Sequence, residues 1–106
     1  NVDENVSLVF SKGTASTAPA YYNASNGIRM YQNGAVLDVT ANGKTITSID
    51  FVFDYNMWYL GCDTGSLTAE SNTRTWSGEA TDIKFTCIGT SSSTRAYIKS
   101  MTITYR

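Results

Sequence analysis

The side chains that could do chemistry in this chain are its cysteines, carboxylates, tyrosines and arginines, because the sequence contains no histidine. Without histidine, the Ser-His-Asp and Cys-His arrangements of nucleophilic enzymes and the usual zinc sites are excluded. No glycine-rich loop stands between a strand and a helix, where it would cradle a phosphate. We therefore expect no cofactor and none of these enzyme classes.

The nine acidic side chains could still serve a glycosidase, which needs only two of them at a suitable separation. Most of them fall at outward positions or in turns, for example Asp38, Asp50, Glu70 and Glu79. Asp54 and Asp63 flank an aromatic segment and are the better candidates. A catalytic pair must be held in a cleft, and a chain of this size has no insertion to form one. The acidic residues therefore favour solvated sheet faces over an enzyme.

Calcium is the metal that this sequence could best accommodate. The loop DTGS, residues 63–66, could supply carboxylate and carbonyl oxygens to the ion. However, the loop lacks a repeated acidic spacing, and an ordinary turn closed by the side chain of Asp63 explains it as well. We therefore predict no metal site.

The two cysteines both fall at inward positions of apolar segments, Cys62 in MWYLGC and Cys87 in TDIKFTC. In an exported protein they could form a disulfide, which would close a loop of about 25 residues and add roughly 3 kcal/mol. Alternatively, they are two reduced cysteines that act as small apolar groups, since sharing a core does not ensure the geometry of a bridge. The sequence leaves both alternatives open.

The segment DYNMWYL, residues 54–60, carries an aromatic stripe. If Leu60 points inward, alternation along an extended chain places Trp58 inward as well. Tyr55 and Tyr59 then share the outer face of one strand, roughly 13 Å apart. Such an exposed apolar stripe can mark an interaction surface, and its length suits an extended chain such as a glycan.

A second aromatic group lies in APAYYNASNGIRMY, residues 18–31. Tyr21 and Tyr22 are adjacent, so they point to opposite sides of an extended chain, one over the core edge and the other to solvent. Arg29 is placed opposite the core side of its strand and can donate several hydrogen bonds from a rigid plane. The stretch is therefore either a lid over the core or part of a binding surface. The predicted ligand site consists of Tyr55, Tyr59, Arg29 and either Tyr22 or Tyr21.

Strands must position these side chains, because apolar and polar residues alternate with period two through most of the chain. The pattern is clearest in VSLVF (6–10), AVLDVT (35–40), TITSIDFVFDY (45–55), TDIKFTC (81–87) and RAYIKSMTITYR (95–106). Ile46 is out of step with Ile49, which predicts a β-bulge near Thr47 and Ser48. Trp76 stands alone in a polar segment, which favours a core anchor over a ligand contact.

About eight strands, separated by loops rich in Ser, Thr, Gly and Asn and with no helix of normal length, predict an all-β fold. We expect an antiparallel two-sheet β-sandwich of jelly-roll type. A chain of 106 residues fits a single domain, residues 1–106, with one modest core. Because it begins without Met or an apolar leader, we expect it to be excised from a larger exported protein.

The net charge and the hydropathy of the chain argue against two kinds of interaction, nucleic-acid binding and membrane insertion. A formal net charge of −1 argues against nucleic acid, which would favour a basic face. No apolar run is long enough for a membrane-spanning helix, so we expect no direct membrane insertion of this segment.

Four motifs, taken together and in order, resemble a family of small β-sandwich domains found in secreted proteins and surface lipoproteins of Bacteroidetes. The motifs are APAYYNASNGIRMYQNG (18–34), GKTITSIDFVF (43–53), TWSGEATDIKFT (75–86) and RAYIKSMTITY (95–105). The likeness covers residues 13–105. The resemblance implies a sandwich fold and an extracellular or cell-surface location in a bacterium, and it brings no catalytic residues.

Two functional hypotheses follow. The first is a non-catalytic accessory module that binds a glycan, because related sandwiches often serve as carbohydrate-binding or adhesive accessories. The second is a structural or adhesive spacer whose partners are the neighbouring domains of the parent protein and which has no small-molecule ligand.

Overall fold

The computed structural model describes residues 5–17, 19–22, 27–68 and 72–106, without the side chains of residues 20–22, 55 and 56. These residues form ten β-strands and no helix: β1 (Val6–Ser11), β2 (Ala20–Tyr22), β3 (Gly27–Met30), β4 (Val36–Ala41), β5 (Ile46–Trp58), β6 (Leu60–Cys62), β7 (Ser66–Leu67), β8 (Thr73–Ala80), β9 (Asp82–Cys87) and β10 (Ala96–Tyr105). The described residues thus provide no apolar helix long enough to cross a membrane.

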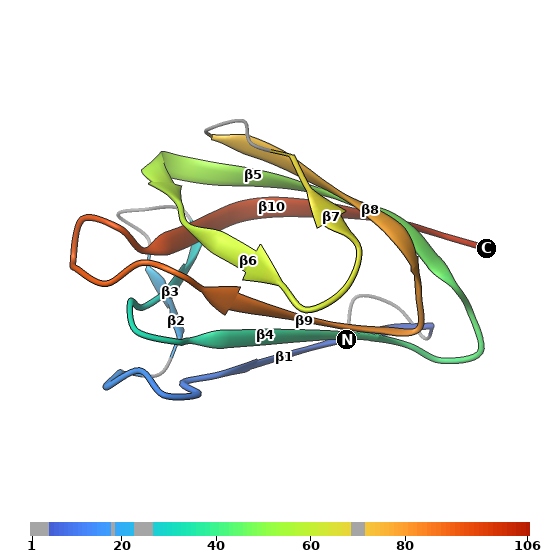
Figure 1. Ribbon diagram of the computed structural model, residues 1–106, viewed down its shortest axis with the longest axis horizontal. Helices are drawn as coiled ribbons and strands as arrows, with labels where there is room; N and C mark the ends of the chain where they lie inside the picture. The colour runs from blue at the N-terminus through green and yellow to red at the C-terminus, as the bar shows by residue number, and fades with distance from the viewer. Residues whose placement is uncertain (1–4, 18, 23–26, 69–71) are drawn as a thin grey trace.

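The strands form two antiparallel sheets that pack face to face (Figure 1). One sheet has four strands in the order β1-β4-β9-β6, and the other has six in the order β2-β3-β10-β5-β8-β7. The chain crosses between the sheets in every connection except β2–β3 and β7–β8. The predicted antiparallel two-sheet β-sandwich is therefore confirmed, with ten strands in the described residues instead of about eight.

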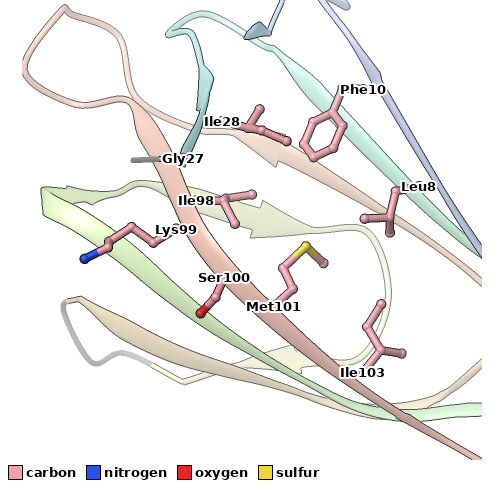
Figure 2. Close-up of a pocket in the computed structure, with 9 residues that line it drawn as sticks. All are labelled: Leu8, Phe10, Gly27, Ile28, Ile98, Lys99, Ser100, Met101 and Ile103. Atoms are coloured by element: carbon pink, nitrogen blue, oxygen red, sulfur yellow. The ribbon is translucent and has the colours of Figure 1, made fainter. Parts of the chain in front are cut away.

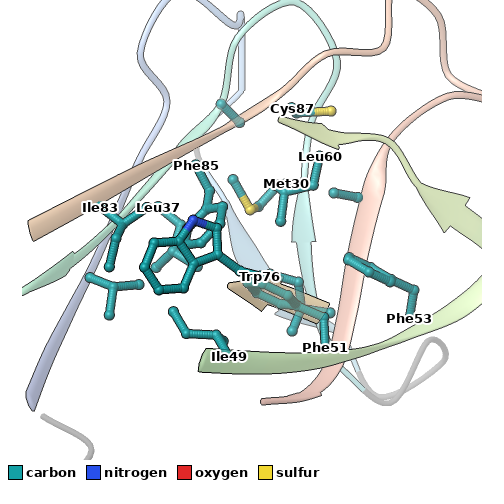
Figure 3. Close-up of a cluster of buried hydrophobic side chains, with 14 of the residues drawn as sticks. Met30, Leu37, Ile49, Phe51, Phe53, Leu60, Trp76, Ile83, Phe85 and Cys87 are labelled. Atoms are coloured by element: carbon teal, nitrogen blue, oxygen red, sulfur yellow. The ribbon is translucent and has the colours of Figure 1, made fainter. Parts of the chain in front are cut away.

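The core lies between the sheets and contains the residues that alternation places inward (Figure 3). Leu37 and Val39 of β4 are fully buried opposite Ile49 and Phe51 of β5. The Phe51 ring meets Phe85 of β9 edge to face, with the ring centroids 5.1 Å apart, and this contact joins the two sheets.

Trp76 of β8 is confirmed as a core anchor, with an exposed fraction of 0%. Its Nε1 donates a hydrogen bond of 2.7 Å to the Thr64 carbonyl, which satisfies the polar end of the indole. A Cβ on Gly65 would come within 2.6 Å of the indole Nε1, and a Cβ on Gly78 within 2.9 Å of Cζ2. The indole thus fits between two glycines because neither has a side chain.

The predicted bulge at the start of β5 is confirmed. Ile46 pairs with Ala80 and Ser48 pairs with Ser77, so the ladder between β5 and β8 shifts register between them. The same shift occurs against β10, where Tyr105 pairs with Ile46. The bulge turns Ile46 into the core even though it is out of step with Ile49.

The segment MWYLGC is not the single strand that its pattern predicts. Trp58 pairs with Ala96 at the end of β5, in the six-stranded sheet, whereas Leu60 pairs with Cys87 in the four-stranded sheet. Tyr59 lies between the two strands, at the point where the chain changes sheets. The pattern is misleading here because residues 57–60 form an unbroken apolar and aromatic run, with no turn residue to mark the change of sheet.

Candidate functional site

The candidate site begins at the corner where the chain passes from β5 to β6. Tyr59 is half-buried, and its ring stacks on that of Trp58, with centroids 4.3 Å apart and planes 13° apart. The Tyr59 backbone is also fixed, since its N–H donates to the Arg95 carbonyl at 3.4 Å and its own carbonyl accepts from Ile88 at 3.0 Å. The corner therefore holds a partly exposed aromatic ring in a defined position.

This geometry corrects one part of the predicted site. Tyr59 does not lie on β5, so it cannot share the outer face of that strand with Tyr55. The side chains of Tyr55, Tyr21 and Tyr22 lie outside the described residues. Their backbones belong to β5 and β2, where Tyr21 pairs with Ile28 of β3 and Tyr22 with Gly27.

The buried side chain of Arg74, on β8, stabilises the corner between β5 and β6. Its side chain is 9% exposed, and its Nε donates to the Thr68 carbonyl at 2.7 Å. Its Nη1 donates to the carbonyls of Trp58 and Leu60 at 3.2 and 2.8 Å. One guanidinium therefore satisfies carbonyls on both sides of the sheet change, because its donors form a rigid fork. Burial lowers the pKa of Arg74, and the nearby Cys62 opposes that shift.

Arg95 lies beside Tyr59 and is the centre of a second group of contacts. Its Nε donates to Oε1 of Gln32 at 2.6 Å, and its Nη1 donates to the Tyr97 hydroxyl at 3.2 Å. Its Cζ also lies 4.5 Å from the centroid of the Tyr31 ring, which is a cation–π distance. Arg95 therefore connects the start of β10 to the turn between β3 and β4.

Arg29 is brought into the same group by Tyr97. The two residues pair across β3 and β10, and Cζ of Arg29 lies 4.8 Å from the centroid of the Tyr97 ring. Tyr97 itself is only 6% exposed. Arg29 contacts the Tyr97 ring, Tyr97 accepts a hydrogen bond from Arg95, and the Arg95 carbonyl accepts one from Tyr59. These contacts connect Arg29 with Tyr59, two of the predicted site residues, through two residues that the prediction did not include.

Sequence reasoning missed Arg95, Tyr97 and Gln32 as members of this group. The segment RAYIK did contain a signal, because Arg95 and Tyr97 are two residues apart and therefore lie on one side of an extended chain. Gln32 gave no such signal, since it approaches Arg95 across 63 residues of sequence. We call Arg29, Tyr31, Gln32, Arg95 and Tyr97, together with Trp58 and Tyr59, the Arg95 surface.

The loop before β10 holds Arg95 in place. Thr94 Oγ1 accepts hydrogen bonds of 3.0 Å from the backbone N–H groups of both Thr90 and Ser91. The Gly89 carbonyl accepts a bond of 2.9 Å from the Asn33 N–H. A Cβ on Gly89 would lie 1.4 Å from the Thr94 carbonyl oxygen, so the loop can close in this way only with glycine at that position.

An apolar groove of about 280 Å³ lies at a different place, between β1 and β10 (Figure 2). Its walls are formed mainly by apolar residues: Leu8, Phe10, Ile28, Ile98, Met101 and Ile103. Lys99 and Ser100 also line it, but in Figure 2 their polar ends point away from its apolar side chains. The groove offers contact area and no titratable group directed into it.

The two cysteines are free thiols in this structure. Cys62 Sγ lies 3.9 Å from the Gly65 carbonyl, and Cys87 Sγ lies 3.7 Å from the Thr94 carbonyl. Burial raises the pKa of both thiols; Asp63 adds to the shift at Cys62. Of the two alternatives left open by the sequence, the structure contains the reduced pair.

Asp63 does not close its own turn. Its Oδ1 accepts a hydrogen bond of 2.9 Å from the Lys84 N–H, and its N–H donates to the Lys84 carbonyl at 3.1 Å, so it connects the loop to β9. Asp50, another acidic residue considered above, accepts a bond of 2.8 Å from the Thr75 hydroxyl. In the part of the chain that the structure describes, no three acidic, cysteine or histidine side chains come together as metal ligands would.

Comparison with known proteins finds no matching family model, no similar curated protein and no similar solved structure.

Proposed function

We propose that this chain is a non-catalytic module that binds a glycan, in a secreted or surface-exposed bacterial protein. The observation that supports this most directly is Tyr59, a partly exposed ring stacked on Trp58 and fixed by backbone hydrogen bonds to Arg95 and Ile88. Sugar rings stack on flat apolar faces, and a ring that is already ordered loses little conformational entropy on binding.

The polar groups of the Arg95 surface would bind sugar hydroxyls. Arg95 and Gln32 lie within hydrogen-bonding distance of one another, and both carry further donors that a hydroxyl could accept. Binding would be weak, because a shallow surface buries little area and a few contacts offset only part of the cost of association. Weak binding is adequate where a parent protein carries several such modules, since linkage raises the local concentration.

A structural or adhesive spacer is the second candidate function. The observation that favours it is the apolar groove between β1 and β10, which a neighbouring domain of the parent protein could cover. In this case the Arg95 surface would serve to order the corner and the β9–β10 loop, with no ligand.

A glycan-array screen followed by titration of amide chemical shifts distinguishes the two. With oligosaccharides at millimolar concentration, we expect shifts at the amides of Tyr59, Ile88 and Arg95. Tyr59→Ala should weaken binding about tenfold, the equivalent of about 1.4 kcal/mol, whereas the control Tyr59→Phe keeps the ring and most of the affinity. If no sugar on the array perturbs this region, the spacer function stands and the glycan function falls.

A further inference from the structure

We infer that the glycan is acidic, and that Arg95 binds the carboxylate of a uronic acid unit. This inference depends on the proposed function, because it names the class of sugar that the same surface would take. It rests on the hydrogen-bonding state of Arg95, on the absence of an acidic partner for it within the described residues, and on its position beside Tyr59.

The first step is a count of the donors on Arg95. A guanidinium has five N–H groups, and the hydrogen bonds to Gln32 and Tyr97 occupy one on Nε and one on Nη1. Nη2 has no hydrogen-bond partner among the described residues. Since these residues contain no buried side-chain nitrogen or oxygen without a partner, Nη2 must reach solvent. The two N–H groups of Nη2 and the second N–H group of Nη1 are therefore available to a ligand.

The second step concerns charge. The partners of Arg95 are an amide, a phenol and an aromatic ring, and none of them is negative. Among the described residues, the ion pair found is on the exposed surface, between Arg106 and Glu79. The half-buried Arg95 thus forms no ion pair with a carboxylate of the described residues. An anion bound there would not have to displace an internal partner.

The third step concerns shape. The contact with Tyr31 restrains the plane of the guanidinium, and the bonds to Gln32 and Tyr97 fix its rotation within that plane. A planar fork held in this way matches the two oxygens of a carboxylate, which can accept two parallel N–H bonds. An ordinary hydroxyl would use only one of them. The geometry therefore favours a uronic acid over a neutral sugar.

The fourth step is proximity to the aromatic platform. The Tyr59 N–H donates to the Arg95 carbonyl, so the two side chains originate from adjacent points of the surface. A sugar ring packed on Tyr59 could thus place a carboxylate on its own or the next unit within reach of Arg95. The chain has a net charge of −1, so this attraction would be local to Arg95 and reduced by salt.

The test uses matched pairs of oligosaccharides: oligomers of galacturonic, glucuronic and mannuronic acid, each with its carboxyl-reduced neutral counterpart. With the wild-type chain at low salt, we expect at least one acid to bind about tenfold or more tightly than its neutral counterpart. Arg95→Gln should bring the two affinities together, and Arg95→Lys should retain only part of the difference because lysine lacks the fork. The control Arg106→Gln removes an exposed arginine elsewhere and should change neither affinity.

The outcomes separate this inference from the proposed function. If acid and neutral forms bind equally, or the difference survives Arg95→Gln, the uronate inference is overturned and glycan binding stands. If neither these pairs nor any sugar on the array binds, both fall. Equal binding of acid and neutral forms by the wild-type chain alone overturns the inference, so it stays falsifiable even if a variant fails to fold.

Discussion

Cys62 and Cys87 lie on neighbouring antiparallel strands but two residues out of register. Leu60 pairs with Cys87 and Cys62 pairs with Phe85, so the two cysteines occupy diagonal positions of the β6–β9 ladder. Diagonal neighbours are about 7–8 Å apart in such a ladder, whereas disulfide-bonded Cα atoms are usually about 4.4–6.8 Å apart. The cysteines therefore share a region of the sandwich without being placed for a bridge.

The first prediction is that both thiols stay reduced in the purified protein. The intact mass should be the same before and after treatment with reductant, and a thiol reagent should modify both cysteines in denaturant. In the native state Cys87 should react more slowly than Cys62, because Cys87 is buried and Cys62 only half-buried. A loss of native thiol reactivity together with a mass gain on reduction would show that the strands can shift to form the bridge.

The second prediction concerns alkaline pH. Burial raises the pKa of Cys87 in the folded state, so folding favours the protonated thiol. The resulting stability is complete below the unfolded-state pKa, about 8.5, and declines as the pH rises through the higher folded-state pKa. Urea unfolding should therefore show a smaller loss of stability between neutral and alkaline pH in Cys87→Val than in the wild type.

All other ionisable side chains are common to both proteins, so their effects cancel in the comparison. Cys62→Val serves as a second comparison variant, because burial and then the charge of Asp63 also raise the pKa of this more exposed thiol. Parallel stability curves for wild type and Cys87→Val would contradict the prediction.

The third prediction is that Arg74 is a major contributor to stability. Arg74→Met removes the donors to the carbonyls of Thr68, Trp58 and Leu60 and should cost about 2–4 kcal/mol of the free energy of unfolding. The control is Arg106→Met, which breaks an ion pair whose side chains are both 66% exposed and should cost under about 0.5 kcal/mol. Equal costs for the two variants, measured by urea unfolding, would refute this role.

The fourth prediction compares two glycines. In Gly89→Ala the new methyl group would lie 1.4 Å from the Thr94 carbonyl oxygen, so the backbone must move, at a cost of about 3 kcal/mol. In Gly43→Ala nothing lies within 4 Å of the new methyl, and only the positive φ of 74° is unfavourable, at about 1 kcal/mol.

Thermal unfolding of the two glycine variants measures the difference. Because Gly89 closes the loop that precedes Arg95, Gly89→Ala should also shift the amide resonances of Tyr97 and Gln32, which Gly43→Ala should leave in place. If Gly89→Ala lowers the thermal stability less than Gly43→Ala does, the loop before β10 can accommodate a side chain at position 89 and the prediction is wrong.

Much of the framework was predictable from the sequence, because it depends on local properties. Alternation with period two follows from strand geometry, so it placed Leu37, Val39, Ile49 and Phe51 in the core correctly. The offset of Ile46 likewise predicted the bulge, since one extra residue changes the face of every side chain beyond it. The position of Trp76 followed from the large apolar area of an indole in a polar segment.

The pairing of strands and the site that results were decided only by the tertiary structure. β2 is only three residues long and β8 has few apolar residues, so neither can be recognised alone. They are strands because β3 and β5 offer them backbone hydrogen bonds. The chain changes sheets at Tyr59 within an unbroken apolar and aromatic run, so no pattern revealed it. Arg95 meets Gln32 across 63 residues of sequence. Such contacts depend on register between distant strands, whereas alternation within one strand specifies only which side faces the core.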